Sequence, residues 1–192
     1  GLRAEQVGAV GLAGQMHSLV CLDERGTAVR PAILWADQRS AVQVDWVNGQ
    51  LGRDKLAACA GNPLATGFAL SSWLWLLENE PETFRRTRWL MQPKDFLRFQ
   101  LTGVIGSEPS DASATLFFDP HSRSWSPALL EIAHLSADRM PPLGESADVC
   151  GGLTPQAAAD LGLRAGTPVV FGGSDQAVQA LGQEIGRASC RE

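Results

Sequence analysis

The sequence predicts an α/β or α+β domain with a helical insertion, and three observations predict it. Short runs of small and β-branched apolar residues open the chain, which is typical of strands. Its middle part carries apolar residues at helical spacing. Near the C-terminus an apolar run passes directly into a helical pattern. Strands, several helices and then a strand followed by a helix favour a domain in which helices pack on a sheet.

The size and composition are those of an ordinary globular protein. The 192 residues can bury a substantial core, and 44% of them are hydrophobic while 19% are charged. The net charge of −5 is spread along the chain, which argues against a nucleic-acid or anionic-membrane surface. No apolar run approaches the ~18–20 residues that cross a bilayer. The four cysteines lack metal-ligand spacing, so we expect reduced thiols in a cytoplasmic protein.

Extended segments are expected in the N-terminal part. Residues 7–13 (VGAVGLA) and 18–23 (SLVCLD) are short apolar runs, and residues 23–26 (DERG) have the composition of a turn. Residues 27–30 and the apolar run at 31–37 (PAILWAD) continue the pattern. Together these segments predict a β-meander.

Helices are expected to dominate the middle of the chain. Apolar residues at i, i+3, i+4 and i+7, prolines in first turns and glycines after last turns mark four of them, over residues 70–81, 93–103, 125–135 and 153–163. After them we expect a short buried strand at 168–171 (PVVF) and a helix over 175–182 (DQAVQALG). We find no internal repeat in the sequence.

Polar residues follow the first predicted strand. Gln15, Met16 and His17 lie at its junction with the second strand. A single histidine is more often a surface residue or a hydrogen-bonded core residue than a ligand contact. His17 alone therefore leaves both interpretations open.

Asp175 lies where the last strand ends and the last helix begins. Ligands of α/β sheets gather outside the carboxyl ends of the strands, and a helix N-terminus favours phosphate charge there. A simple N-cap aspartate is the alternative for this residue.

Taken together, the two polar groups predict a cleft for a polyhydroxy ligand. A sheet can bring both strand ends to one edge despite their separation in sequence. Directional hydrogen bonds would come from Gln15, His17 and Gln176, and Met16 and Trp35 would offer apolar walls to carbon–hydrogen faces.

Five ordered blocks of the sequence resemble one known family, the FGGY carbohydrate kinases. The similarity covers nearly all of residues 1–183 and rests on GLAGQMHSLVCLD, RPAILWADQR, QPKDFLRFQLTG, SDASATLFFD and TPVVFGGSDQAVQALG. The Gln-Met-His triplet and the ILWADQR stretch look most like the members of that family that phosphorylate xylulose.

The resemblance implies an actin-like, ribonuclease-H-like fold and ATP-dependent phosphorylation of a sugar hydroxyl with ATP and Mg²⁺. It implies that Asp175 is the general base and lies near the Mg²⁺, directly or through water. Met16 and His17 match the substrate-binding pair of the family, Gln176 matches the next sugar contact, and Trp35 matches a position that lines the sugar pocket.

The substrate that the resemblance favours is D-xylulose, converted to xylulose 5-phosphate. Gln176 stands where some xylulose-phosphorylating members have Asn. Another FGGY kinase acting on gluconate, glycerol or a different ketose or polyol stays open, as does a non-catalytic actin-like sugar-binding module. The expected partners are the sugar and ATP, without nucleic acid or membrane, and a homodimer of the full-length protein is left open.

Residues 184–192 (EIGRASCRE) resemble the translation of a short-read sequencing adapter. We therefore expect the native sequence to stop near residue 183 and residues 1–183 to be a partial N-terminal, sugar-binding domain. The family's phosphate loop and C-terminal adenosine-binding domain are expected outside these residues, so that the piece alone would be inactive.

Overall fold

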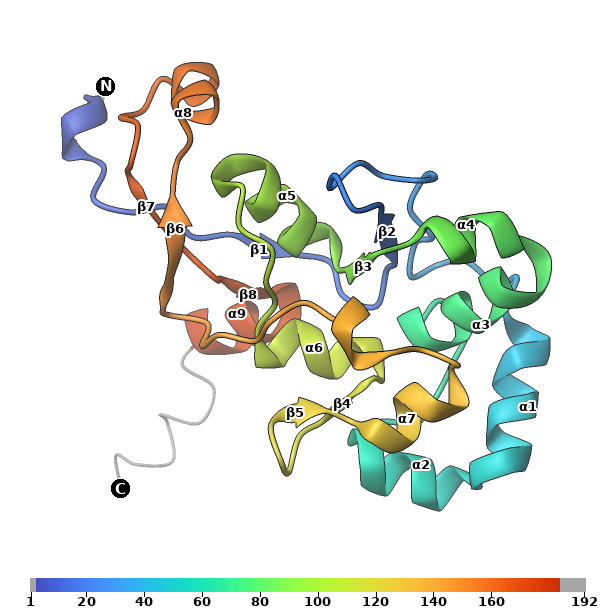
Figure 1. The fold of residues 1–192 in the computed structure, drawn as a ribbon. Helices are drawn as coiled ribbons and strands as arrows, with labels where there is room; N and C mark the ends of the chain where they lie inside the picture. Colours follow the sequence, from blue (N-terminus) through green and yellow to red (C-terminus); the bar gives the residue numbers. More distant parts are fainter. Residues whose placement is uncertain (1–2, 184–192) are drawn as a thin grey trace, which may run out of the picture.

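A computed structural model describes residues 3–183 of the chain, which form a mixed α/β fold (Figure 1). The adapter-like segment 184–192 lies outside the described residues. In Figure 1 the strands that belong to the two ends of the chain lie on the left, and the helices of its middle part lie on the right and below. The α/β class with a helical insertion is thereby confirmed.

Parallel pairing joins the two ends of the described chain. Strand β1 (Ala13–Gly14) pairs with β8 (Gly173–Ser174), with Ala13 opposite Gly173 and Gly14 opposite Ser174. Just before it, Val10 N–H donates to the Pro168 carbonyl oxygen at 2.8 Å. The chain around β1 thus runs alongside β7 (Pro168–Val170) and β8, and β7 pairs antiparallel with β6 (Val149–Gly152) on its other side.

The predicted β-meander is wrong in two respects. The first strand does not pair with the second: β2 (Val20–Leu22) pairs antiparallel with β3 (Trp89–Met91). The turn at residues 23–26 is confirmed, because Gly26 N–H donates to the Asp23 carbonyl oxygen at 3.0 Å. Residues 31–37 are not a regular strand, since only Ile33 is bridged, to Leu19. A short hairpin of β4 (Phe118–Asp119) and β5 (Ser124–Trp125) completes the strands of the described chain.

Helices account for much of the remaining structure of residues 3–183. They are α1 (Ala41–Leu51), α2 (Arg53–Ala60), α3 (Ala69–Asn79), α4 (Pro81–Arg86), α5 (Pro93–Thr102), α6 (Pro109–Thr115), α7 (Pro127–Ile132), α8 (Pro155–Leu161) and α9 (Asp175–Gly182), with 3₁₀ turns at Ala4–Gln6 and Ala137–Arg139. Five of them begin with proline, whose fixed φ suits the first helical position. Left-handed glycines follow three of them, at Gly61, Gly103 and Gly162.

The main apolar core lies among the helices and surrounds Trp73. This side chain is fully buried and its indole N–H donates to the Ala133 carbonyl oxygen at 3.0 Å. Its ring centroid lies 4.5 Å from that of Phe84. Leu56, Leu70 and other apolar residues from α1, α2, α3 and α7 fill the same cluster, which supports the side of the fold away from β1 and β8.

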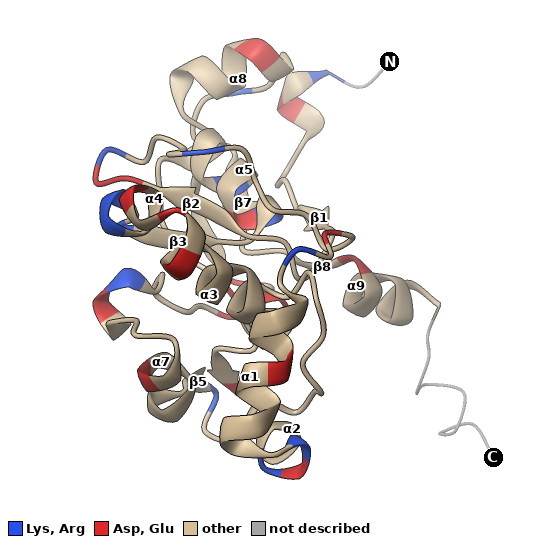
Figure 2. Cartoon of the chain, turned by 90° about the vertical axis from the view of Figure 1, so that its right-hand side faces the viewer, with Lys and Arg blue, Asp and Glu red and all other residues tan. Residues whose placement is uncertain are grey.

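Charged residues of both signs are interspersed over the fold (Figure 2). Within residues 3–183, no helix has the length and apolar character that crossing a membrane requires.

Candidate functional site

The parallel register of β1 and β8 brings the two predicted polar groups together. Gln15, Met16 and His17 directly follow Gly14 at the end of β1, and Asp175 directly follows β8. Carboxyl ends of neighbouring parallel strands meet at the same edge of a sheet. Residues more than a hundred and fifty positions apart in sequence therefore follow the ends of two adjacent strands.

A cavity of about 200 Å³ lies at these strand ends. The residues that line it are Gln15, Met16, His17, Trp35, Asp175 and Gln176. They are the same six residues that the sequence assigned to a ligand cleft. Drug-sized ligands occupy pockets of ~300–1,000 Å³, so this cavity suits a smaller and more polar molecule.

A larger cavity of about 480 Å³ lies nearby, between β1, β8 and α9. Its walls include Leu12, Ala177, Val178 and Leu181, and only Ser110 and Ser146 bring polar side chains. A polyhydroxy ligand needs several directional hydrogen-bonding groups. The smaller cavity supplies them, and it is therefore the candidate site.

The backbone at His17 adopts an uncommon conformation. Its φ is 69°, a left-handed value that a residue other than glycine seldom takes. Ser18 N–H donates across it to the Met16 carbonyl oxygen at 2.9 Å. A three-residue turn with this hydrogen bond and a positive central φ is the strained form of the γ-turn. Such strain gathers at functional sites, and here it fixes the direction in which the histidine leaves the chain.

The His17 ring is held on two sides. Its Nδ1 lies 3.0 Å from the Ala114 carbonyl oxygen at the end of α6, and its centroid lies 4.1 Å from that of Phe68. A carbonyl oxygen only accepts hydrogen bonds, so Nδ1 carries a hydrogen and Nε2 is the ring nitrogen left for a ligand. His17 can therefore be both a hydrogen-bonded residue of the fold and a ligand contact. Its Nδ1 is bonded to the protein, and its Nε2 is available to a ligand.

Ser18 is a site residue that the sequence reasoning missed. Its side chain is fully buried, and its Oγ lies 3.4 Å from the Met16 carbonyl oxygen and accepts from Trp35 N–H at 3.1 Å. One hydroxyl thus connects the turn at His17 with the loop that carries the exposed indole of Trp35. A serine between two apolar runs gives no sequence signal for this role.

Asp175 is the first residue of α9 and is partly buried. Ser174, not Asp175, is the N-cap residue, so the alternative of a simple N-cap aspartate is not what the structure has. The Asp175 Oδ1 accepts from Gln176 N–H at 2.8 Å, which leaves Oδ2 for a ligand. The carboxylate therefore lies at a helix N-terminus, where backbone N–H groups and the helix dipole favour negative charge.

Glycines allow the close packing behind the site. A Cβ on Gly14 would lie 2.8 Å from the Cβ of Lys94, and a Cβ on Gly172 would overlap the Leu12 carbonyl oxygen. The φ of Gly172 is +81°, which also favours glycine. The absence of a side chain at Gly14 lets α5 pack closely on β1. The absence of one at Gly172 lets the residue before β8 pack closely on Leu12, the residue before β1.

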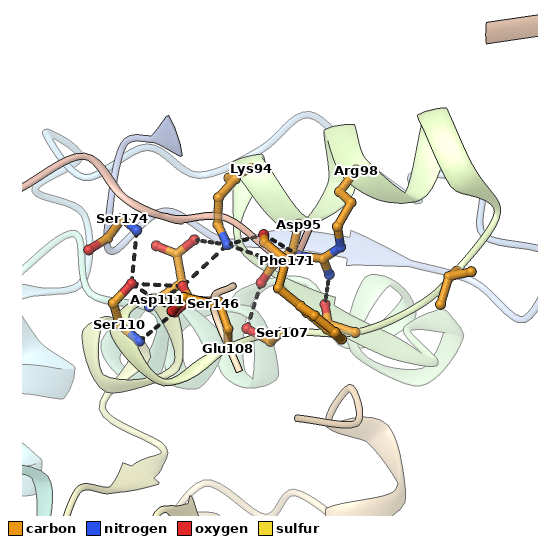
Figure 3. A network of polar contacts seen from close by, with 12 residues as sticks. Lys94, Asp95, Arg98, Ser107, Glu108, Ser110, Asp111, Ser146, Phe171 and Ser174 are labelled. Atoms are coloured by element: carbon orange, nitrogen blue, oxygen red, sulfur yellow. Dashed lines mark hydrogen bonds and ion pairs between the residues drawn. The ribbon is translucent and has the colours of Figure 1, made fainter. Parts of the chain in front are cut away.

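Behind the strand ends lies a buried polar network that the sequence reasoning also missed (Figure 3). It consists of Lys94, Asp95 and Arg98 from α5, Ser107 and Glu108 from the following loop, Ser110 and Asp111 from α6, and Ser146, with contacts to the backbone of Phe171 and Ser174. Two cations thus face three carboxyl groups out of contact with water.

The third carboxyl group of the network is that of Asp111. Burial, with the charges of Asp95 and Glu108 adding to it, raises the pKa of Asp111 to about 7 against the attraction of Lys94. Its Oδ2 lies 3.2 Å from Lys94 Nζ, yet neither carboxyl oxygen accepts a well-directed hydrogen bond from the described residues. Asp111 is therefore protonated more readily than Glu108, whose pKa the same surroundings lower.

The sequence and the fold both match known carbohydrate kinases. Residues 1–182 match the profile of the FGGY family of carbohydrate kinases, N-terminal domain. The chain is 40% identical to a xylulose kinase of Bacillus subtilis over 96% of this chain and 37% of that protein, and 39% identical to a xylulose kinase of Escherichia coli over 93% of this chain and 36% of that protein. The structure of a "xyloylose kinase" from Brucella ovis is 35% identical and superimposes with a TM-score of 0.84 over 93% of this chain and 37% of that one.

The chain spans little more than a third of the length of these relatives. Its solved neighbours are FGGY carbohydrate kinases, which have the actin-like ATPase fold, and this confirms the predicted fold. The chain is a member of the FGGY family of carbohydrate kinases, corresponds to the family's N-terminal domain, and most resembles the xylulose kinases within it.

Proposed function

We propose that the full-length protein transfers the γ-phosphoryl group of ATP to a hydroxyl of D-xylulose, giving xylulose 5-phosphate and ADP. The observation that carries the proposal is the single cavity that Asp175 shares with Gln15, Met16, His17 and Trp35. The 39–40% identity to xylulose kinases favours this sugar over others.

Asp175 acts as the general base. Phosphoryl transfer passes through a loose transition state, so the protein mainly positions the reacting groups. The carboxylate orients the sugar hydroxyl as a hydrogen-bond acceptor and takes its proton as the oxygen attacks the phosphorus atom. Oδ1 is already engaged by Gln176 N–H, so Oδ2 is the atom that receives the proton.

The other cavity residues bind and orient the sugar. His17 Nε2 contacts a sugar hydroxyl while Nδ1 stays bonded to the Ala114 carbonyl oxygen. The amides of Gln15 and Gln176 offer both donors and acceptors. Met16 and the exposed indole of Trp35 cover the carbon–hydrogen faces of the sugar and limit the access of water.

The donor chemistry of the site fits Mg²⁺ and ATP. Mg²⁺ prefers oxygen ligands and is commonly held by one or two carboxylates, waters and substrate phosphates, and Asp175 offers a carboxylate oxygen at a helix N-terminus. When bound, the ion offsets the negative charge of the transferring phosphoryl group. Asp175 would hold it directly or through a water molecule.

Asp175→Ala tests the proposal in the full-length enzyme that contains this chain. We expect kcat for D-xylulose to fall by ~10²–10⁴-fold, the usual contribution of a general base, while calorimetry still detects binding of the sugar. A variant that keeps a near-normal kcat would refute the base assignment.

Substrate choice is tested by kcat/KM for D-xylulose, gluconate and glycerol side by side. We expect D-xylulose to be preferred, and a clear preference for another of the three would overturn the substrate. Sugar binding without any consumption of ATP would favour a non-catalytic module instead. We also propose that the 192-residue chain alone is inactive, which turnover by that chain would contradict.

A further inference from the structure

The ammonium group of Lys94 is fully buried behind the candidate site (Figure 3). Its Nζ lies 3.1 Å from Asp95 Oδ1, 3.2 Å from Glu108 Oε1 and 3.2 Å from Asp111 Oδ2. It also donates to the Phe171 carbonyl oxygen at 3.1 Å. Burial opposes the charge of Lys94, but the carboxylates outweigh it and raise its pKa. Lys94 is therefore a fixed cation that holds both side chains and backbone.

Glu108 connects this cation to Ser110. Its two carboxylate oxygens accept from Ser110 Oγ at 2.7 and 2.9 Å, and Oε2 also accepts from Ser146 Oγ at 2.7 Å. Burial opposes the ionisation of Glu108, but Lys94 and the hydroxyls of Ser146 and Ser110 outweigh it and lower its pKa. The ionised carboxylate takes the only hydrogen of the Ser110 hydroxyl, so the lone pairs of that hydroxyl face away from it.

One of those lone pairs accepts a hydrogen bond from the backbone of Ser174, the residue that precedes Asp175. Ser174 N–H donates to Ser110 Oγ at 2.9 Å. At the start of the same segment, the Phe171 carbonyl oxygen accepts from Arg98 Nη1 at 3.0 Å as well as from the lysine. Both ends of the segment that leads into Asp175 are thus bonded to the network.

Stability alone does not explain why charged side chains rather than apolar ones fill this buried network. Moving charges out of water is expensive, and apolar side chains of similar volume often hold a fold equally well or better. Here the cations and the hydroxyl direct their bonds to backbone atoms at residues 171 and 174. Hydrogen bonds, unlike apolar contacts, are directional, so they define where the end of β8 lies.

We propose that Ser110 is a positioning residue for Asp175, and that Lys94 and Glu108 hold Ser110 in the orientation that this requires. The proposal rests on the function proposed above, because it assigns to Ser110 the placement of the general base. A misplacement of ~1 Å at a reacting group can lower the rate by ~10²-fold. One hydrogen bond to the residue before Asp175 is therefore enough to matter.

Ser110→Ala in the full-length enzyme removes the hydroxyl and leaves the ion pairs of Lys94 in place. We expect kcat for D-xylulose to fall by ~10–100-fold and KM to change by less than about twofold, because the sugar-binding groups stay where they are. Hydrogen exchange followed by mass spectrometry should show faster exchange in the peptide that contains the Ser174 amide.

Ser110→Thr keeps the hydroxyl and should restore both kcat and the slow exchange. Ser110 borders the cavity of about 480 Å³, and we expect that cavity to accommodate the additional methyl group. Ser110→Val has the shape of threonine without the hydroxyl, so the Thr and Val variants test the bond even if the Ala variant is unstable.

Ser113→Ala is the matched control in the same helix. Ser113 Oγ donates to the Pro109 carbonyl oxygen at 2.7 Å, a bond within α6 that does not reach β8. We expect its kcat to equal that of the wild type.

The positioning role is wrong if the wild type phosphorylates D-xylulose while the Ala and Val variants keep kcat within about twofold; the proposed function then still stands. A wild type that phosphorylates none of the sugars tested would overturn the proposed function, and the positioning role with it.

Discussion

The core around Trp73 and the network around Lys94 are both closed to water, but they are held together by different forces. Trp73 packs among apolar side chains and needs one hydrogen bond, to the Ala133 carbonyl oxygen. Lys94 lies among three carboxyl groups, and the energy of its surroundings depends on their protonation. The apolar core supports the helices, whereas the polar network lies directly behind the strand ends that carry the site.

The difference teaches where precision is needed in this fold. Apolar packing tolerates substitutions that conserve volume, so it fixes the fold without fixing each atom. A charged network in a low-dielectric interior is sensitive to every member. Its position behind β8 therefore suits the placement of a single carboxylate, and the two regions should respond differently to pH.

The largest effect is expected for Lys94→Met. Removing one partner of a buried ion pair leaves uncompensated charge and costs ~3–5 kcal/mol. Without the cation, the folded state binds protons on the buried carboxylates more readily than the unfolded state does. Stability of the variant should therefore rise as pH falls from about 8 to about 5, and the gap to the wild type should narrow. Urea unfolding at several pH values measures this.

Trp73→Ala is the matched control in the apolar core. It should cost a similar ~3–5 kcal/mol, because a large buried side chain is replaced by a cavity. That loss should be the same at each pH, since no titratable group lies in the change. Parallel pH profiles for the two variants would contradict the distinction between the regions.

A smaller effect is expected for Asp111→Asn, which sharpens the charge argument. The pKa of Asp111 is raised from 3.8 to about 7. A raised folded-state pKa contributes stability that is fully present below the unfolded value and is lost as pH rises through the folded value. The Asp111 carboxyl therefore contributes stability that is lost as pH rises from about 4 to about 7, so over this range the variant should gain on the order of 3 kcal/mol relative to the wild type. Thermal unfolding across this range tests it, and identical slopes for the two proteins would refute it.

The smallest effect on stability is expected for Ser18→Ala, which touches the site without any charge. Loss of the hydroxyl should cost ~1–2 kcal/mol because Trp35 N–H loses its acceptor. In the full-length enzyme we expect KM for the sugar to rise several-fold and kcat to change little. Ser40→Ala is the control. Ser40 Oγ donates to Ser71 Oγ at 3.1 Å, and neither serine lines the cavity. An unchanged KM in the Ser18 variant would argue against its role in holding the cavity walls.

Much of the fold and the composition of the cavity could be predicted from the sequence. Helices over 69–79, 93–102, 155–161 and 175–182 follow the expected periodicity and end signals. The pairing of β1 with β8 could not be derived from local patterns, because the residues of one strand do not indicate which distant segment it pairs with. The shared cleft was inferred from the polar residues at two predicted strand ends, and all six expected cavity residues lie together. Their individual roles stay predictions.

Local sequence patterns did not predict helix α1 or the burial of two charged residues of α5. Helix α1 begins at Ala41 without a strong apolar stripe, and its buried residues are Gln43 and Val47. Lys94 and Arg98 have the spacing of a solvated helix face, yet both are fully buried. Whether a charged side chain is buried depends on the carboxylates that other segments bring to it, and a local sequence pattern does not contain them.

The backbone at His17 has a consequence for how this protein could evolve. Glycine would occupy the positive φ at that position without steric penalty, whereas histidine gives up on the order of 1 kcal/mol to be there. Selection for heat resistance alone would thus tend to replace the imidazole by glycine. A sequence that retains histidine here has a slightly lower folding stability, and it keeps an imidazole whose direction is fixed by the turn.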